Sequence, residues 1–208
     1  ENSRTFNISY PNARPTDLPS DSIMPSRSPN GKWVTFASNR DKVWEIYIAA
    51  MDGSVAPRRA TFTQAMESNP MWSPAGQTIV YQSMRDDNWE LYLFDISSGS
   101  EQRLTNNPGN DVNPHWSPDG SRIVFQSNRD GLSQIYLLDL ASGLITRLSD
   151  GDFNDFDPQF SPDGLYILFT STRGENGNRM IYGVQTDGSN PAPISDPSQD
   201  ASHPAWAD

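Results

Sequence analysis

The chain has 208 residues and a formal net charge of −11 at pH 7. So acidic a chain is not expected to bind nucleic acid or an anionic membrane surface, because both are polyanions. It has no cysteine, which excludes disulfides and thiolate chemistry. No apolar run approaches the ~18 residues of a membrane-spanning helix, so we expect no direct membrane insertion.

A four-residue signature, Ser-Pro-x-Gly, recurs along the chain at nearly constant spacing. The copies begin at Ser28, Ser73, Ser117 and Ser161, so the intervals are 45, 44 and 44 residues. A period of this length indicates a repeat architecture, in which many copies build one surface. Full repeats are expected at 25–69, 70–113, 114–157 and 158–203, with partial repeats at 1–24 and 204–208.

The first repeats predict short strands. In chain order, residues 6–10 are a candidate strand of the N-terminal partial repeat. The first full repeat has a predicted second strand at 33–36 and a third at 46–47, and the next repeat has them at 79–81 and 91–92. β-Branched and aromatic residues dominate these segments, as expected of buried strands.

The third repeat gives the clearest division into strands and turns. Four strands are predicted at 113–116, 122–127, 134–140 and 144–148. The turn at 117–120 has proline second and glycine fourth, which suits a type I turn. The fourth repeat is predicted to hold strands at 167–169 and 181–182, and residues 203–208 to form the innermost strand of a following blade.

These patterns predict an all-β protein, because no segment shows a sustained helical period. Four-stranded antiparallel units of ~40–45 residues are typical of the blades of a β-propeller, whereas a β-sandwich does not need so strict a period. We expect four complete blades and partial blades at both ends. Residues 1–208 form either a single domain closed by a composite blade or a propeller fragment. The second-strand sequence missing from both ends favours the fragment.

The third repeat resembles a known family. It reads Pro-x-Trp-Ser-Pro-Asp-Gly from Pro114, Ile-Val-Phe-x-Ser-Asn-Arg-Asp-Gly from Ile123, and Ile-Tyr-x-x-Asp from Ile135. This resembles the WD-like repeat of TolB-type β-propellers, and the resemblance covers about residues 25–208. It implies the fold more strongly than a function. Such repeats occur in the periplasmic TolB protein, which binds partner proteins, beside peptidase domains, in some lyases and in bacterial surface proteins.

Three positions depart from the repeat pattern. Arg27 replaces the aromatic before the signature, and Ala75 replaces the aspartate of the turn. Gly174 stands where the other repeats have an aspartate, namely Asp41, Asp86 and Asp130.

Two sets of residues recur once per repeat. One is an arginine and the other is the tyrosine of the predicted third strand. An arginine ring could bind an anionic ligand, but a residue repeated in every blade is more often architectural, with its guanidinium holding a carboxylate or backbone carbonyls. We therefore predict structural columns at Arg40, Arg85, Arg129 and Arg173, and at Tyr47, Tyr92, Tyr136 and Tyr182.

The loop that enters each predicted first strand is acidic. Glu67, Asp111 and Asp155 share one position, three residues before the proline of that strand. In a propeller this loop lies at the mouth of the central channel, where several carboxylates would attract a cation or a basic partner. The alternative is solvated turn acids. The predicted partner-binding residues are Glu67, Asp111, Asp155, Asp157, Asp200, His115 and His203.

The sequence predicts no cofactor and no catalytic residues. No Gly-x-Ser-x-Gly elbow, His-Glu-x-x-His motif or phosphate-binding loop is present. Asp150, Asp152 and Asn154 have the alternating oxygen ligands of a calcium loop, but the expected glycine and glutamate are missing. A structural Ca²⁺ is therefore a weak candidate, and two histidines do not make a strong zinc site.

The leading hypothesis is a non-catalytic module that binds a protein or peptide with a basic segment through its acidic channel-face loops. The alternatives are an accessory propeller of a larger enzyme such as a peptidase, a structural subunit of a multi-protein assembly, and a carbohydrate-binding propeller. The resemblance implies a periplasmic or extracellular location, although a chain without cysteine also fits the cytoplasm.

Overall fold

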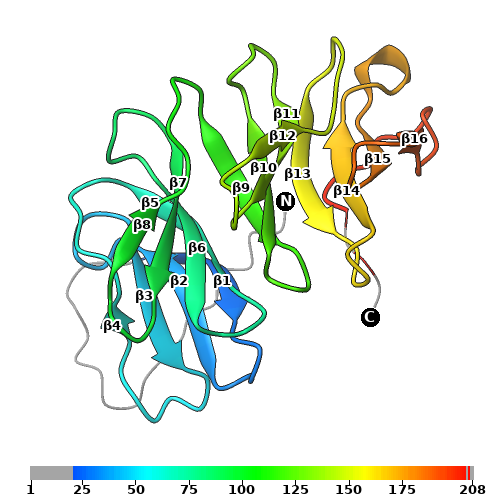
Figure 1. Ribbon diagram of the computed structural model, residues 1–208. Coiled ribbons are helices and arrows are strands. Elements are labelled where there is room, and N and C mark those ends of the chain that lie inside the picture. Colours follow the sequence, from blue (N-terminus) through cyan, green and yellow to red (C-terminus); the bar gives the residue numbers. More distant parts are fainter. Residues whose placement is uncertain (1–20, 205, 207–208) are drawn as a thin grey trace. The chain divides into compact units, whose positions relative to one another are not determined.

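The computed structural model describes residues 21–204 and residue 206. In this part of the chain, four consecutive strands form each of four antiparallel sheets (Figure 1). The one helical element among these residues is a short 3-10 turn, η1 (Glu175–Gly177). These sheets are propeller blades, as the repeat predicted. No helix in the described residues is long and apolar enough to cross a membrane.

The strands of each blade follow one another in chain order. Blade one has β1 (Ser22–Arg27), β2 (Trp33–Ser38), β3 (Glu45–Ala50) and β4 (Arg58–Arg59). Blade two has β5 (Glu67–Trp72), β6 (Thr78–Ser83), β7 (Glu90–Asp95) and β8 (Glu101–Arg103). Blade three has β9 (Asp111–Trp116), β10 (Arg122–Ser127), β11 (Gln134–Asp139) and β12 (Ile145–Arg147). Blade four has β13 (Asp155–Phe160), β14 (Tyr166–Ser171), β15 (Met180–Gln185) and β16 (Ala192–Pro193).

The first strands begin earlier than the sequence predicted. β9 begins at Asp111, two residues before the predicted start, and β1 begins at Ser22, inside the segment assigned to a partial repeat. The predicted strand at 6–10 lies outside the described residues. The strand predicted at 203–208 is not formed at His203, Pro204 or Trp206. In each blade the first strand pairs with the second strand of the same sheet, and none of the described residues His203, Pro204 and Trp206 belongs to a sheet.

The Ser-Pro-x-Gly signature forms a turn that belongs to the scaffold. In blade three the amide of Gly120 donates to the carbonyl of Ser117 at 2.9 Å, and Gly120 has a φ of 72°, which glycine adopts without steric cost. The Ser117 hydroxyl also accepts the amide of Arg122 at 2.9 Å. The carbonyl and the hydroxyl of Ser117 therefore both stabilise the turn between the first and second strands.

The chain divides into two compact units, Glu1–Leu104 and Thr105–Asp208. Unit 1 contains blades one and two, and Ile46, Ile48, Ile79 and Tyr81 belong to its apolar core. Unit 2 contains blades three and four, and its core also consists of aliphatic and aromatic side chains from both blades, among them Val124, Ile135, Leu148, Ile167 and Phe169. Burying each such side chain stabilises a unit by about 1.5–3 kcal/mol. Each blade therefore depends on its neighbour for stability.

Candidate functional site

The recurring arginine follows the second strand of every blade by two residues. In blades one, two and three its Nε donates to the hydroxyl of the serine that ends the strand. These distances are 3.1 Å for Arg40 to Ser38, 3.0 Å for Arg85 to Ser83 and 3.0 Å for Arg129 to Ser127. The serine thereby sets the direction in which the guanidinium points.

Three of these arginines pair with the acidic residue that begins the first strand of their own blade. Glu67, Asp111 and Asp155 are all fully buried. The Nη2 atoms of Arg85, Arg129 and Arg173 lie 2.7, 2.8 and 3.3 Å from their carboxylate oxygens. In blade one Ser22 occupies this position, and its hydroxyl accepts from Nη2 of Arg40 at 3.4 Å.

This burial corrects the expectation that Glu67, Asp111 and Asp155 present a negative surface to a partner. Because β5, β9 and β13 begin at these residues, the carboxylates lie inside the sheets and not in a solvated loop. Burial is the main effect on each group and raises its pKa, while the paired arginine acts in the opposite direction. The three carboxylates hold the protein's own arginines.

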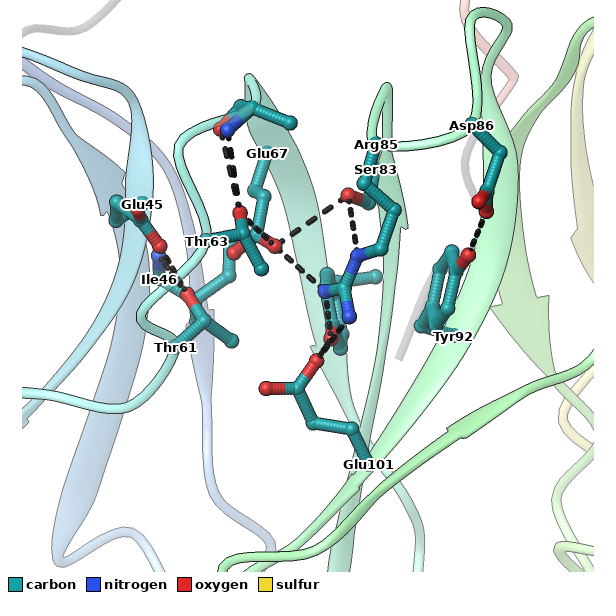
Figure 2. A network of polar contacts seen from close by, with 12 residues as sticks. Glu45, Ile46, Thr61, Thr63, Glu67, Ser83, Arg85, Asp86, Tyr92 and Glu101 are labelled. Atoms are coloured by element: carbon teal, nitrogen blue, oxygen red, sulfur yellow. Dashed lines mark hydrogen bonds and ion pairs between the residues drawn. The ribbon is translucent and has the colours of Figure 1, made fainter.

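Figure 2 shows the arrangement in unit 1, where Arg85 lies between Glu67 and Glu101. Nη1 of Arg85 is 2.5 Å from Oε2 of Glu101, and Nη2 is 2.8 Å from the hydroxyl oxygen of Tyr81. A hydroxyl from Thr63 donates to the same Glu67 oxygen at 2.9 Å. The network joins the second blade to the segment that connects it to the first.

The recurring tyrosine lies beneath the arginine. The guanidinium carbons of the four arginines are 4.6, 4.0, 4.7 and 4.8 Å from the ring centroids of Tyr47, Tyr92, Tyr136 and Tyr182. Three of these hydroxyls donate to a turn aspartate, and the Tyr136 hydroxyl lies 2.5 Å from Asp130. Gly174 occupies the aspartate position in blade four. These contacts fit the structural role predicted for both columns.

A second layer of buried acids was missed at the sequence level. Glu45 and Glu90 begin β3 and β7 and are fully buried. Glu45 accepts the hydroxyl of Thr61 at 2.9 Å, as Figure 2 shows, and it also pairs with Arg59. Burial, reinforced by nearby Glu67, raises the pKa of Glu45 to about 7. The signal was present, because a glutamate or glutamine stands two residues before the tyrosine in three repeats.

Each first strand contains a bulge at the residue before its proline. In blade three, Val112 pairs with Gln126 and His115 pairs with Val124, so Asn113 and Pro114 together stand opposite one residue. The same irregularity occurs in β1, β5 and β13. Proline tolerates this place because it has no amide to donate to the ladder. A bulge of this kind redirects the side chain beside it.

The residue before the proline adopts the left-handed conformation in every described copy. The φ values are 53° for Met24, 53° for Asn69, 54° for Asn113, 51° for Asp157 and 57° for His203. This conformation is uncommon outside glycine, although asparagine, aspartate and histidine are enriched in it. The backbone geometry is thus constant while the side chain changes from blade to blade.

In unit 2 this position forms a continuous line of polar side chains, which we call the first-strand row (Asn113, Asp157 and His203). Nδ2 of Asn113 donates to Oδ1 of Asp157 at 2.8 Å. Nε2 of His203 lies 3.7 Å from Oδ2 of the same carboxylate. β9 and β13 contact each other, which brings the first two residues together. The structure therefore unites two predicted partner-binding residues, Asp157 and His203, with one that was not predicted.

The remaining predicted residues lie apart from the row. The ring of His115 packs 6.4 Å from that of Phe160, between the blades of unit 2, and burial lowers its pKa. Asp200 accepts the amide of Arg179 at 2.9 Å and so ties the C-terminal segment to the start of β15. The side chains of His115 and Asp200 therefore make contacts within the protein, and neither belongs to the first-strand row.

The candidate calcium loop is held by hydrogen bonds within unit 2. The side-chain oxygen of Asn154 accepts the amide of Ser133 at 3.0 Å, while Asp150 is 97% exposed. Asp152 is exposed as well. Among residues 21–204 and 206, no group of three or more histidine, cysteine or acidic side chains is arranged to hold a metal ion.

Two protein-family models match the chain. The family model described as the TolB beta propeller domain matches residues 15–155. A second model, the N-terminal region of dipeptidyl peptidase IV, matches residues 107–206. No curated protein matches the chain.

Among solved structures, the putative TolB from Agrobacterium tumefaciens is similar with a TM-score of 0.71 and 28% identity over 81% of this chain and 63% of the other. TolB from Acinetobacter baumannii has a TM-score of 0.64 and 25% identity over 82% of this chain and 40% of the other. A puromycin-hydrolyzing peptidase from Mycobacterium tuberculosis shares the fold, with a TM-score of 0.70 and 17% identity. The similarity covers 88% of this chain and 30% of the peptidase. The chain thus spans less than two thirds of each of these proteins.

Proposed function

Because the chain belongs to the TolB beta-propeller family, we propose that it is a non-catalytic module that binds a protein or peptide. The observation that carries the proposal is the first-strand row. One strained backbone position is repeated in each blade, yet in unit 2 it carries an amide, a carboxylate and an imidazole, at Asn113, Asp157 and His203. Identical residues at such a position would indicate architecture. Differing polar groups, held in fixed directions, suit recognition of a specific partner.

The charge of the chain supports a partner with a basic or amide-rich segment. The net charge is −11, while the buried acids are largely paired with arginines. The unpaired negative charge is therefore concentrated on exposed side chains. Attraction of this kind speeds association and weakens as salt is added.

Selection from a random dodecapeptide display library against the immobilised chain tests this function. We expect enriched peptides to be rich in lysine, arginine, asparagine and glutamine, and their synthetic versions to bind more weakly at 300 mM than at 50 mM salt. A combined Asn113→Gly, Asp157→Asn and His203→Gly variant should lose binding while its melting temperature stays near that of the parent, because glycine and asparagine both tolerate the left-handed conformation of these positions. Absence of enrichment, or unchanged binding by this variant, would refute the proposal.

A second candidate is an accessory propeller within a larger enzyme. The match of residues 107–206 to the N-terminal region of dipeptidyl peptidase IV favours it, and the similarity to a peptidase of which the chain covers 30% is in line with it. Sequencing the native gene on both sides of this segment separates the two. A continuous reading frame into an α/β hydrolase domain supports the accessory role, and a frame that lacks one removes it.

The proposed location is the periplasm or the extracellular space, following the family resemblance. Fractionation of the native cells, with antibodies raised against this chain, tests it. Recovery in the osmotic-shock or medium fraction supports export, and recovery with cytoplasmic markers contradicts it.

A further inference from the structure

We propose that Asp157 is the anchor for one cationic side chain, lysine or arginine, of the bound peptide; this inference rests on the proposed function. The first-strand row would then recognise the peptide through a single charge held by two neutral or weakly basic neighbours. Three properties of Asp157 support this role: it lacks the arginine partner that Asp155 has, its carboxylate has unused acceptor sites, and its neighbours hold it in place.

Asp155 and Asp157 lie two residues apart in β13 but differ in their surroundings. The side chain of Asp155 is 0% exposed and faces Arg173 at 3.3 Å. The side chain of Asp157 is 34% exposed, and no lysine or arginine of the described residues pairs with it. The first carboxylate is neutralised internally, whereas the second keeps its charge available at the surface.

The hydrogen-bonding capacity of Asp157 is only partly used. A carboxylate offers about four acceptor sites. Oδ1 accepts from Asn113 at 2.8 Å, whereas Oδ2 faces Nε2 of the His203 imidazole at 3.7 Å. That separation is too long for a hydrogen bond. An ammonium or guanidinium group can therefore bond to Oδ2 without displacing the Asn113 contact.

The neighbours of Asp157 hold it in place from both sides. Nδ2 of Asn113 also lies 3.3 Å from Oε1 of Gln126, whose own Nε2 donates to Ser133 at 3.1 Å. On the other side, the amide of His203 donates to the hydroxyl of Thr170 at 3.1 Å. A carboxylate fixed in this way loses little conformational entropy on binding, which favours affinity.

A cationic side chain fits this site better than a metal ion. Metal sites in proteins need several oxygen or nitrogen ligands at about 2.0–2.6 Å, and the row supplies one carboxylate, one imidazole and one amide whose nitrogen faces the carboxylate. One carboxylate is enough for an ammonium or guanidinium group, whose charge-assisted hydrogen bonds are about twice as strong as neutral ones. The side chain of Asp157 is 34% exposed, so a cationic group can reach it from solvent.

The test uses two pools of fluorescent nonapeptides that differ only at the central residue. One pool has lysine and the other has norleucine, so length and apolar stem are matched. Binding is measured by fluorescence anisotropy with the wild-type chain. We expect the lysine pool to bind at least tenfold more tightly than the norleucine pool, because a hydrogen bond to a charged group contributes about 1.5–3 kcal/mol. In an Asp157→Asn variant the two pools should bind equally, because the isosteric amide cannot pair with the cation.

Asp152→Asn is the matched control, since it removes the same charge from an exposed side chain elsewhere in unit 2. It should keep the tenfold preference. Asparagine also tolerates the left-handed conformation at position 157, so the variant should fold. The comparison of pools on the wild-type chain needs no variant at all.

The outcomes separate this inference from the proposed function. If both pools bind the wild-type chain equally, or if Asp152→Asn removes the preference as strongly as Asp157→Asn, the chain binds peptides but Asp157 is not the anchor. If neither pool binds and the dodecapeptide selection also fails, the proposed function itself is wrong, and the anchor with it.

Discussion

Oε1 of Glu67, on the first residue of β5, lies 2.7 Å from Nη2 of Arg85, which follows β6 by two residues. The glutamate is completely buried, and its position along the repeat is that of Asp111 and Asp155. The pair lies between the first and second strands of one blade, where it joins the sheet to the incoming connection. Buried pairs of this kind are costly to form, but removing one partner leaves an uncompensated charge.

The first prediction concerns the equivalent pair in unit 2. Arg129→Met removes the guanidinium that lies 2.8 Å from the buried carboxylate of Asp111. We expect a loss of about 3–5 kcal/mol in the free energy of unfolding at pH 8, measured by urea denaturation. Arg58→Met, at an exposed arginine, is the matched control and should change stability by less than about 0.5 kcal/mol.

The loss in Arg129→Met should also depend on pH. Burial already raises the pKa of Asp111, and removal of the arginine raises it further. A protonated Asp111 carries no charge to bury, so the penalty should be smaller at pH 5 than at pH 8. An equal penalty at both pH values would show that packing of the arginine stem, and not its charge, is what matters.

The second prediction concerns the pH dependence contributed by Glu45. Its folded-state pKa of about 7 lies above the ordinary value of 4.5, so the folded state favours the protonated form. The stability that this group contributes is fully present below its unfolded-state pKa and is lost as pH rises through 7. The loss amounts to at most about 3 kcal/mol.

Glu45→Gln should therefore raise the melting temperature relative to the wild type at pH 8 and leave it nearly unchanged at pH 5. Glutamine keeps an oxygen for Thr61 and Arg59 but has no charge to desolvate. Blade three already uses this solution, because Gln134 stands in the same place and accepts the hydroxyl of Ser149 at 2.9 Å. Calorimetry from pH 5 to 8.5 tests this prediction. A difference in melting temperature between Glu45→Gln and the wild type that stays constant over this range contradicts it.

The third prediction is a stabilising substitution at the first-strand bulge. Met24 is 46% exposed and has a φ of 53°, a conformation that costs an unbranched side chain about 1–2 kcal/mol. Asparagine tolerates it better and already occupies the equivalent positions 69 and 113. We expect Met24→Asn to stabilise unit 1 by up to about 1 kcal/mol in urea denaturation.

Met51 provides the control for this substitution. It is 52% exposed and does not have a positive φ. Met51→Asn should therefore bring no gain. Equal effects of the two substitutions would indicate that reduced surface hydrophobicity, and not relief of backbone strain, explains the change.

The fourth prediction concerns Gly174, which replaces the aspartate that accepts the tyrosine hydroxyl in the other blades. A Cβ atom at this glycine would lie 2.4 Å from the backbone oxygen of Asn178. Restoring the repeat pattern with Gly174→Asp should therefore destabilise the protein by more than about 1 kcal/mol, although it offers a partner to Tyr182.

Asp130→Ala provides the comparison, because it removes the acceptor of the Tyr136 hydroxyl without a clash. It should cost about 1 kcal/mol, the usual value of one hydrogen bond. Thermal denaturation of both variants checks these values. A gain in stability from Gly174→Asp would show that the loop around residue 178 moves to admit the side chain.

Much of the fold could be predicted from the repeat because its determinants are local. The turn at 117–120 depends on proline and glycine at fixed positions, and the strand at 122–127 on a run of β-branched and aromatic residues. Both occur where predicted, as the Gly120-to-Ser117 hydrogen bond and β10 show. The arginine and tyrosine columns were visible as well, since register alone identifies them.

The bulge before each proline was harder to foresee. The sequence predicts a strand at 113–116, but asparagine followed by proline is more typical of turns, and nothing in Asn69-Pro70 or Asn113-Pro114 indicates an extra residue within a strand. In the structure they lie inside strands β5 and β9, where the pairing partner accommodates an extra residue. The first-strand row depends on this geometry, so spacing alone did not reveal Asn113.

The sequence by itself determined four blades, their turns and the columns that repeat in them, because these follow from local propensity and a fixed period. Tertiary structure alone decided which carboxylates are buried and which remain open. Asp155 and Asp157 are both acids within three residues of Pro158, and both were predicted from the sequence to bind a partner. Packing of β13 against β14 buries the first against Arg173, whereas the bulge turns the second toward Asn113 and His203.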